Sequence, residues 1–163
     1  MDAGQKTIDR YLVVACFWIA LQMGCGPEQK APVVKKAAVV KPVDESRRFP
    51  KAGLVQTRVA EDRVMGKKFL PGGTIATYGK GNSEYELFLV KMADAQSAAI
   101  ALLDWKKEME GAKLIPAFGG YFGKDAGRPV FVFTKGAWLA GVAGLGEKEA
   151  DEKARPLASQ ISF

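Results

Sequence analysis

Residues 129–143 read PVFVFTKGAWLAGVA and carry the clearest structural signal in the chain. Apolar residues, several of them β-branched or aromatic, fill Pro129–Thr134 and again Ala137–Ala143, as in two neighbouring β-strands. The Lys135-Gly136 step between them is short, and its glycine suits the tight turn of a hairpin. The stretch therefore predicts an antiparallel pair of strands.

Upstream of this hairpin, shorter apolar runs predict the rest of a sheet. The strongest of them is Tyr85–Met92, YELFLVKM, which a glycine-rich turn separates from the run before it. The other expected strands are Leu54–Ala60, Thr74–Gly79 and the short segment Tyr121–Lys124.

Two stretches have the spacing of amphipathic helices. Asp94 is placed to cap a helix over Ala95–Glu110, and Gly111 stands where a C-terminal cap is expected. A second helix begins at about Glu147, and Pro156 should kink or restart it. Apolar residues recur at helical spacing at Ala95, Ala98, Ala99, Leu102, Leu103 and Met109 in the first and at Ala150, Ala154, Leu157 and Ile161 in the second.

The order of these elements predicts an α+β fold. We expect an antiparallel sheet of about five strands with both helices packed on one face, in a single domain spanning residues 50–163. This pattern resembles that of domains in uncharacterised bacterial exported proteins. The resemblance implies no particular activity.

The chain of 163 residues contains no histidine and only two cysteines, Cys16 and Cys25. A Ser-His-Asp triad, a Cys-His pair and a histidine-ligated metal are therefore excluded. Because both cysteines precede the expected domain, a disulfide, a zinc–cysteine site or an iron–sulfur cluster cannot form within it. We expect neither a cofactor nor a metal site.

Residues 1–24 have the features of a secretory signal peptide. Lys6 and Arg10 precede residues 11–23, YLVVACFWIALQM, which carry no charge. As a helix this uncharged run would measure about 20 Å, short of the ~30 Å hydrocarbon core of a bilayer. It therefore has the length of the apolar region of a signal peptide rather than that of a membrane-spanning helix.

Residues 21–25, LQMGC, resemble the lipobox of bacterial lipoproteins. That family favours leucine three positions before the cysteine, and here this position is Gln22. The resemblance implies that Cys25 is lipidated, that the signal is cut before it, and that the mature protein is anchored to a membrane of the cell envelope. In a bacterium with two membranes, Gly26 lacks the acidic retention signal, which implies the outer membrane, facing the periplasm.

Two other interpretations of this segment stay open. It could serve as an uncleaved N-terminal anchor, or Cys25 could be an incidental apolar residue of the signal. Residues 13–16, VVAC, match the lipobox more closely, but too few apolar residues precede Cys16 to form the apolar region.

Residues 25–49 have the composition of a basic tether. The part from Ala31 to Val43 contains only Ala, Pro, Val and Lys, and Pro32 and Pro42 favour an extended backbone. Six basic residues outnumber three acidic ones in the tether. It could lie on anionic lipid headgroups or serve as a soluble spacer.

Few residues of the domain suggest catalysis. Glu84 and Glu86 are two apart on an expected strand and should share a face, where they could act as acid and base on glycans or hold a divalent cation. The alternative is a solvated strand edge. Ser83 and Lys80 are the one local candidate for a Ser–Lys pair.

Two further features invite a binding interpretation. Residues 119–124, GGYFGK, look like a phosphate loop, but Lys124 is followed by Asp125 and a turn, so we interpret them as a glycine-rich bend. Several aromatic residues could line a ligand groove, with core packing as the alternative. They are Trp105, Tyr121, Phe122, Phe131, Phe133 and Trp138.

These features favour a lipid-anchored cell-envelope protein with a non-catalytic domain that binds a partner protein, a wall component or a small ligand. An envelope enzyme that uses Glu84 and Glu86, or a Ser–Lys pair, is one alternative. An electrostatic structural role for the tether is another. Nucleic acid is not expected as a partner, because the 16 basic and 13 acidic residues of the domain nearly balance.

Overall fold

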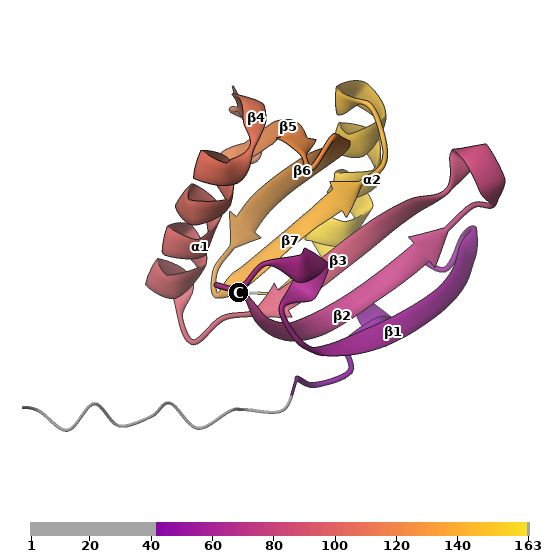
Figure 1. The fold of residues 1–163 in the computed structure, drawn as a ribbon. Coiled ribbons are helices and arrows are strands. Elements are labelled where there is room, and N and C mark those ends of the chain that lie inside the picture. The colour runs from indigo at the N-terminus through magenta and orange to yellow at the C-terminus, as the bar shows by residue number, and fades with distance from the viewer. Residues whose placement is uncertain (1–41, 163) are drawn as a thin grey trace, which may run out of the picture. The chain divides into compact units, whose positions relative to one another are not determined.

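The computed structural model describes residues 42–162, so the signal segment 1–24, Cys25 and the tether up to residue 41 lie outside the described residues. The described part is an α+β domain with an antiparallel sheet, as expected (Figure 1). Its strands are β1 (Leu54–Asp62), β2 (Pro71–Tyr78), β3 (Tyr85–Lys91), β4 (Glu110–Ile115), β5 (Gly120–Asp125), β6 (Arg128–Lys135) and β7 (Trp138–Ala143), and its helices are α1 (Ala95–Glu108) and α2 (Glu147–Gln160).

Seven strands form the sheet in the order β1-β2-β3-β7-β6-β5-β4. Strands β1 to β3 run as one meander and β4 to β7 as a second, and α1 connects the two. The two meanders join where β7 pairs antiparallel with β3, and Phe88 lies opposite Gly141 in this pair. The last strand of each meander therefore lies near the middle of the sheet, and the first strand of each lies at a border.

The predicted hairpin is confirmed as β6 and β7. Lys135 pairs with Trp138, so the two-residue loop is Gly136-Ala137, one position later than the sequence indicates. Gly136 has a φ of +56°, which a residue with a side chain rarely adopts.

The expectation that both helices pack on one face is wrong. Leu87 and Leu89 of β3 lie in the core cluster that contains α2, whereas Phe88 and Val90 lie in the cluster that contains α1. Because successive residues of a strand point to opposite faces, the helices cover opposite faces of the sheet (Figure 1). The physical reason is that β3, β6 and β7 are apolar on both faces, and each face needs a cover.

The sheet has seven strands rather than about five, and β4 is the strand for which no range was expected. Strand β4 follows α1 almost at once, because the helix ends at Glu108 rather than Glu110. Gly111 lies inside β4 with a φ of +63° instead of capping the helix, although Asp94 does cap it by accepting a hydrogen bond from the Ser97 N–H. Helix α2 continues through Pro156 and does not restart.

Contacts of the domain begin before residue 50. Phe49 is buried in the cluster that contains α2, and the Glu45 N–H donates to Thr74 Oγ1 at 3.0 Å. The Arg48 guanidinium donates to the Gln160 carbonyl at 2.9 Å, beside the end of α2. The segment 43–49, expected to be part of the tether, therefore contacts the domain, and Phe49 belongs to its core.

Candidate functional site

The carboxylate pair suggested by the sequence does not form a shared site. Glu86 lies on β3, between β2 and β7, and accepts a hydrogen bond from Arg128 at 2.6 Å and a longer one from Arg58 at 3.4 Å. Glu84 precedes β3 and is exposed. The alternative of a solvated edge is also wrong for Glu86, because its strand is internal and two guanidinium groups engage its carboxylate.

Ser83 and Lys80 lie at an exposed turn. Gly81–Ser83 form a single 3-10 turn in which the Ser83 N–H donates to the Lys80 carbonyl at 3.3 Å. Within residues 42–162 no hydrogen bond joins the Ser83 hydroxyl to the Lys80 ammonium. A general base must lie within hydrogen-bond reach of the proton that it removes, and Ser83 and Lys80 make no such contact among the described residues.

The glycine-rich segment 119–124 is not a bend: apart from Gly119, which ends the preceding turn, its residues belong to strand β5, Gly120–Asp125. Gly120 begins β5 directly after the turn and pairs with Ile115 of β4. A Cβ at Gly120 would collide with the Val132 carbonyl oxygen and lie 2.7 Å from the Phe133 Cβ. The glycine is needed because β6 approaches so closely.

The structure brings together a charged network that the sequence did not indicate. The Lys67 ammonium donates to Asp125 at 2.8 Å and to Glu108 at 2.7 Å, and it lies 5.6 Å from the centroid of the Trp105 ring. The indole N–H of Trp105 donates to the second oxygen of Asp125 at 2.7 Å. The residues come from a loop, from α1 and from β5, so only the tertiary fold assembles them.

Charge pairing in this network changes the pKa of Lys67. Burial by itself lowers the pKa of the ammonium, but the hydrogen bonds and negative charges of Asp125 and Glu108 outweigh burial, and the pKa lies above its ordinary value of 10.5. Because folding stabilises the charged form of Lys67, the network adds to the stability of the folded state at every pH below about 10.5. This contribution is lost as the pH rises through the pKa of the folded state.

We expect Lys67→Met to lower the free energy of unfolding by about 2–3 kcal/mol at pH 7, because Asp125 is left mostly buried without its cation. Chemical denaturation of the full chain measures the change. The matched control is Lys113→Met, which breaks the exposed pair with Glu147 and should cost less than about 1 kcal/mol. The difference between parent and Lys67→Met should shrink above pH 10.5, and a difference that grows there would contradict this assignment.

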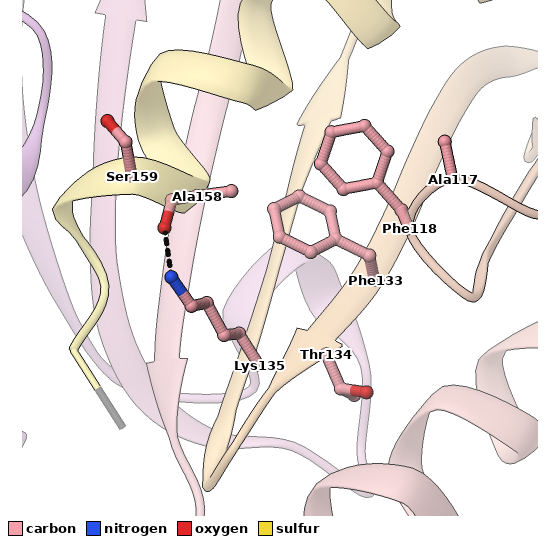
Figure 2. Close-up of a pocket in the computed structure, with 7 residues that line it drawn as sticks. All are labelled: Ala117, Phe118, Phe133, Thr134, Lys135, Ala158 and Ser159. Carbon is pink, nitrogen blue, oxygen red and sulfur yellow. Dashed lines mark hydrogen bonds between the residues drawn. The ribbon is translucent and has the colours of Figure 1, made fainter.

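The most promising binding feature is an open pocket of about 330 Å³ between the end of α2 and the turn from β4 to β5. Figure 2 shows the Phe118 and Phe133 rings together at one side of the pocket, while the Thr134 side chain points away from them. The centroids of the Phe118 and Phe133 rings are 4.9 Å apart. The pocket lining consists of Ala117, Phe118, Phe133, Thr134, Lys135, Ala158 and Ser159.

Two cations flank the aromatic side of the pocket. Lys135 donates to the Ala158 carbonyl at 2.8 Å, near the C-terminus of α2, where a helix favours positive charge. The Arg155 guanidinium lies 5.6 Å from the centroid of the Phe118 ring and is also paired with Asp151. The pocket thus combines an apolar ring surface with positive charge held in place by other contacts.

A second hollow, of about 430 Å³, lies further along the same helix. It is lined by Ile115 at the end of β4 and by Glu147, Lys148 and Asp151 of the first half of α2. Both hollows therefore lie between α2 and residues 115–118. We call this region the α2 groove.

Most aromatic residues that the sequence suggested for ligand binding belong to the core instead. Trp105 is fully buried, Phe131 and Phe133 are almost so, and Trp138 is buried beneath Arg48 and Lys91. Only Phe133 also lines the pocket, and its neighbour Phe118 had no distinguishing signal in the sequence. Phe118 sits in a turn, where neither strand nor helix periodicity indicates which way a side chain points.

Among residues 42–162, no cluster of three or more acidic or cysteine side chains is arranged to hold a metal ion. Neither of the two helices in this part of the chain has the length and apolar character needed to cross a bilayer. Comparisons with models of known protein families, with curated proteins and with solved structures gave no match to this chain.

Proposed function

We propose that this chain is a lipid-anchored cell-envelope protein whose domain binds its ligand or partner without catalysing a reaction. The anchor rests on the signal-like segment and Cys25. The binding role rests on the α2 groove, whose aromatic surface at Phe118 is the single observation that carries it. A domain at the end of a tether is suited to capturing a partner at some distance from the membrane.

The chemistry of the groove favours an amphipathic ligand. The partly exposed ring of Phe118 offers an apolar surface, backed by the buried ring of Phe133, and Lys135 and Arg155 supply positive charge beside it. A ligand with an aromatic or aliphatic group next to a carboxylate would satisfy both. Such groups occur in peptides and in small envelope metabolites alike.

The positions of the candidate catalytic residues support binding over catalysis. Each oxygen of the Glu86 carboxylate is engaged by a guanidinium group of the chain itself, one by Arg128 and the other by Arg58, so the carboxylate is occupied by structural contacts. Ser83 and Lys80 lie at an exposed turn, and neither residue lines the two hollows of the α2 groove.

We expect the aromatic anion 8-anilinonaphthalene-1-sulfonate to bind the folded full chain and to gain fluorescence. Phe118→Ala should lose most of that gain, because it removes the partly exposed ring of the pocket. The matched control is Leu114→Ala, which removes an exposed apolar side chain outside the pocket. Fluorescence titration at a temperature well below unfolding measures both variants.

Two outcomes would contradict the groove as the binding site. The probe could bind Phe118→Ala as strongly as the parent chain, or Leu114→Ala could lose as much signal as Phe118→Ala. Circular dichroism melts of all three proteins show whether a lost signal reflects the pocket rather than unfolding.

A further inference from the structure

The two hollows of the α2 groove lie along one face of α2. Residues three or four positions apart on a helix share a face. The helix residues of the groove follow this spacing, with Glu147, Lys148 and Asp151 at the first hollow, Arg155 between the hollows, and Ala158 and Ser159 at the second. The two sets are about ten residues apart, which corresponds to about 15 Å along the helix axis. A ligand that occupies both hollows must span about this length.

An extended peptide has the spacing to occupy both hollows. A strand rises about 3.3 Å per residue, and its side chains alternate between two faces. Side chains four positions apart therefore point the same way and lie about 13 Å apart. A separation of three or five positions would turn the second side chain to the opposite face. A small acid bound at Phe118, by contrast, leaves the hollow at Ile115 empty.

The polar groups beside the Phe118 ring are hydrogen-bond donors. Lys135 and Arg155 flank the ring, and the Arg155 side chain is 60% exposed. Asp151 engages its Nε and Nη2 atoms, and within residues 42–162 no hydrogen bond involves its Nη1 atom. Ala117 lines the pocket from an exposed turn, and among the same residues its N–H takes part in no hydrogen bond. Donors of this kind match a carboxylate, which only accepts hydrogen bonds.

The acceptors of this hollow are directed elsewhere. Figure 2 shows the side chains of Thr134 and Ser159 pointing away from the two rings. The Ser159 hydroxyl donates to the Pro156 carbonyl at 2.8 Å, and the Ala158 carbonyl accepts from Lys135. A ligand group that needs an acceptor, such as an ammonium, therefore finds less to bind here than a carboxylate does.

The place of this hollow at the end of α2 favours the end of a chain. Helix α2 ends at Gln160, one residue past Ser159, and Arg48 donates to the Gln160 carbonyl at 2.9 Å. The other hollow of the groove lies toward the N-terminal half of α2. A peptide that stops beside Phe118 uses both hollows, whereas an internal acidic residue at this place would carry its chain on past the helix and over Arg48.

We propose that the α2 groove binds the C-terminal end of another polypeptide in an extended conformation, an inference that rests on the binding role proposed above for the groove. The last side chain of the peptide is aromatic or aliphatic and lies against Phe118. Its α-carboxylate is held by Arg155, Lys135 and the Ala117 N–H. The side chain four positions earlier enters the hollow at Ile115, so the peptide runs in the same direction as α2.

Two dye-labelled pentapeptides test the carboxylate, namely Leu-Ser-Thr-Ser-Phe as the free acid and as the C-terminal amide. The full chain in detergent micelles should bind the free acid about tenfold more tightly, because hydrogen bonds to a charged acceptor are about twice as strong as neutral ones. Fluorescence anisotropy measures both affinities, with protein-free micelles as the blank. Arg155→Gln should remove most of the preference for the acid. The matched control is Lys153→Gln, which removes a cation of α2 that lies over Tyr85 and should leave the preference unchanged.

A change at the first position of the peptide tests the second hollow. The free acid Gly-Ser-Thr-Ser-Phe has the same length and carboxylate but no side chain for the hollow at Ile115. It should bind about fivefold more weakly than the leucine peptide, because part of the apolar contact is lost. N-acetyl-phenylalanine, which offers only the last residue, should displace the labelled leucine peptide less effectively than the unlabelled peptide does.

The expected result is a preference for the free acid that depends on Arg155, together with a preference for leucine over glycine. Equal affinity for acid and amide, or no binding of either peptide, would overturn recognition of a C-terminus. Displacement by N-acetyl-phenylalanine that equals displacement by the pentapeptide would show that the ligand is a small acid. If 8-anilinonaphthalene-1-sulfonate still binds in a Phe118-dependent manner in these cases, the groove remains a binding site and only the peptide inference fails.

Discussion

Cys25→Ser is expected to abolish palmitate labelling and to release the protein from membranes washed in high salt. In the family that residues 21–25 resemble, this cysteine carries the acyl chains of the mature protein. Two or three acyl chains anchor firmly, at about 0.8 kcal/mol per buried CH₂. The basic residues of the tether attract anionic headgroups only electrostatically, and salt screens that attraction.

The control for this prediction is Cys16→Ser, which removes the other cysteine of the chain and should leave labelling and membrane association unchanged. Metabolic labelling and fractionation of cells that express the parent chain and the two variants measure the result. Labelling that follows Cys16, or a Cys25→Ser chain that matures and fractionates like the parent, would rule out the lipoprotein proposal.

Phe133→Ala should destabilise the domain by about 3–5 kcal/mol, the usual cost of removing a large aromatic side chain from a core. Phe133 is 1% exposed on β6, and its ring contacts Phe118 at a centroid distance of 4.9 Å and Phe131 at 5.6 Å. Strand β5 already packs closely beside Phe133, since a Cβ at Gly120 would lie 2.7 Å from the Phe133 Cβ, and this leaves little freedom for the sheet to collapse into the space.

Denaturant melts of the full chain measure this change, with Leu114→Ala as the exposed apolar control. Leu114 is half exposed at the border strand β4, so its truncation should change stability by no more than about 0.5 kcal/mol. A Phe133→Ala chain as stable as the Leu114→Ala chain would show that the core is not packed around this ring.

For Glu86, the predicted strand is correct, but the expected exposure of its side chain is wrong. The sequence places Glu86 on a strand, and β3 confirms it. From the sequence alone the residue is expected to be exposed, because an isolated glutamate among apolar residues gives no sign of a partner. Arg58 and Arg128, which hold its carboxylate, lie 28 and 42 residues away in the chain. The sequence around Glu86 contains no pattern that indicates such distant partners.

Helix α1 shows the same limit for side-chain burial. The spacing of its apolar residues predicts a helix, and α1 exists where expected. Yet Leu103 is exposed and Trp105 is fully buried. The reason is that α1 packs on β6 and β7 through the side of the helix that carries Ala98, Ala101 and Trp105. Several stripes of an alanine-rich helix are apolar enough to be buried, and only the sheet beneath decides between them.

The sequence by itself determined the α+β class, the hairpin of β6 and β7, and the cap at Asp94. Each of these follows from patterns among residues that are close together in the sequence. Only the tertiary structure decided that the helices cover opposite faces, that β4 is a strand, and that Phe118 meets Phe133 beside α2. Local periodicity records whether a segment has an apolar face. It does not record which distant segment covers that face, since this depends on the packing of the whole domain.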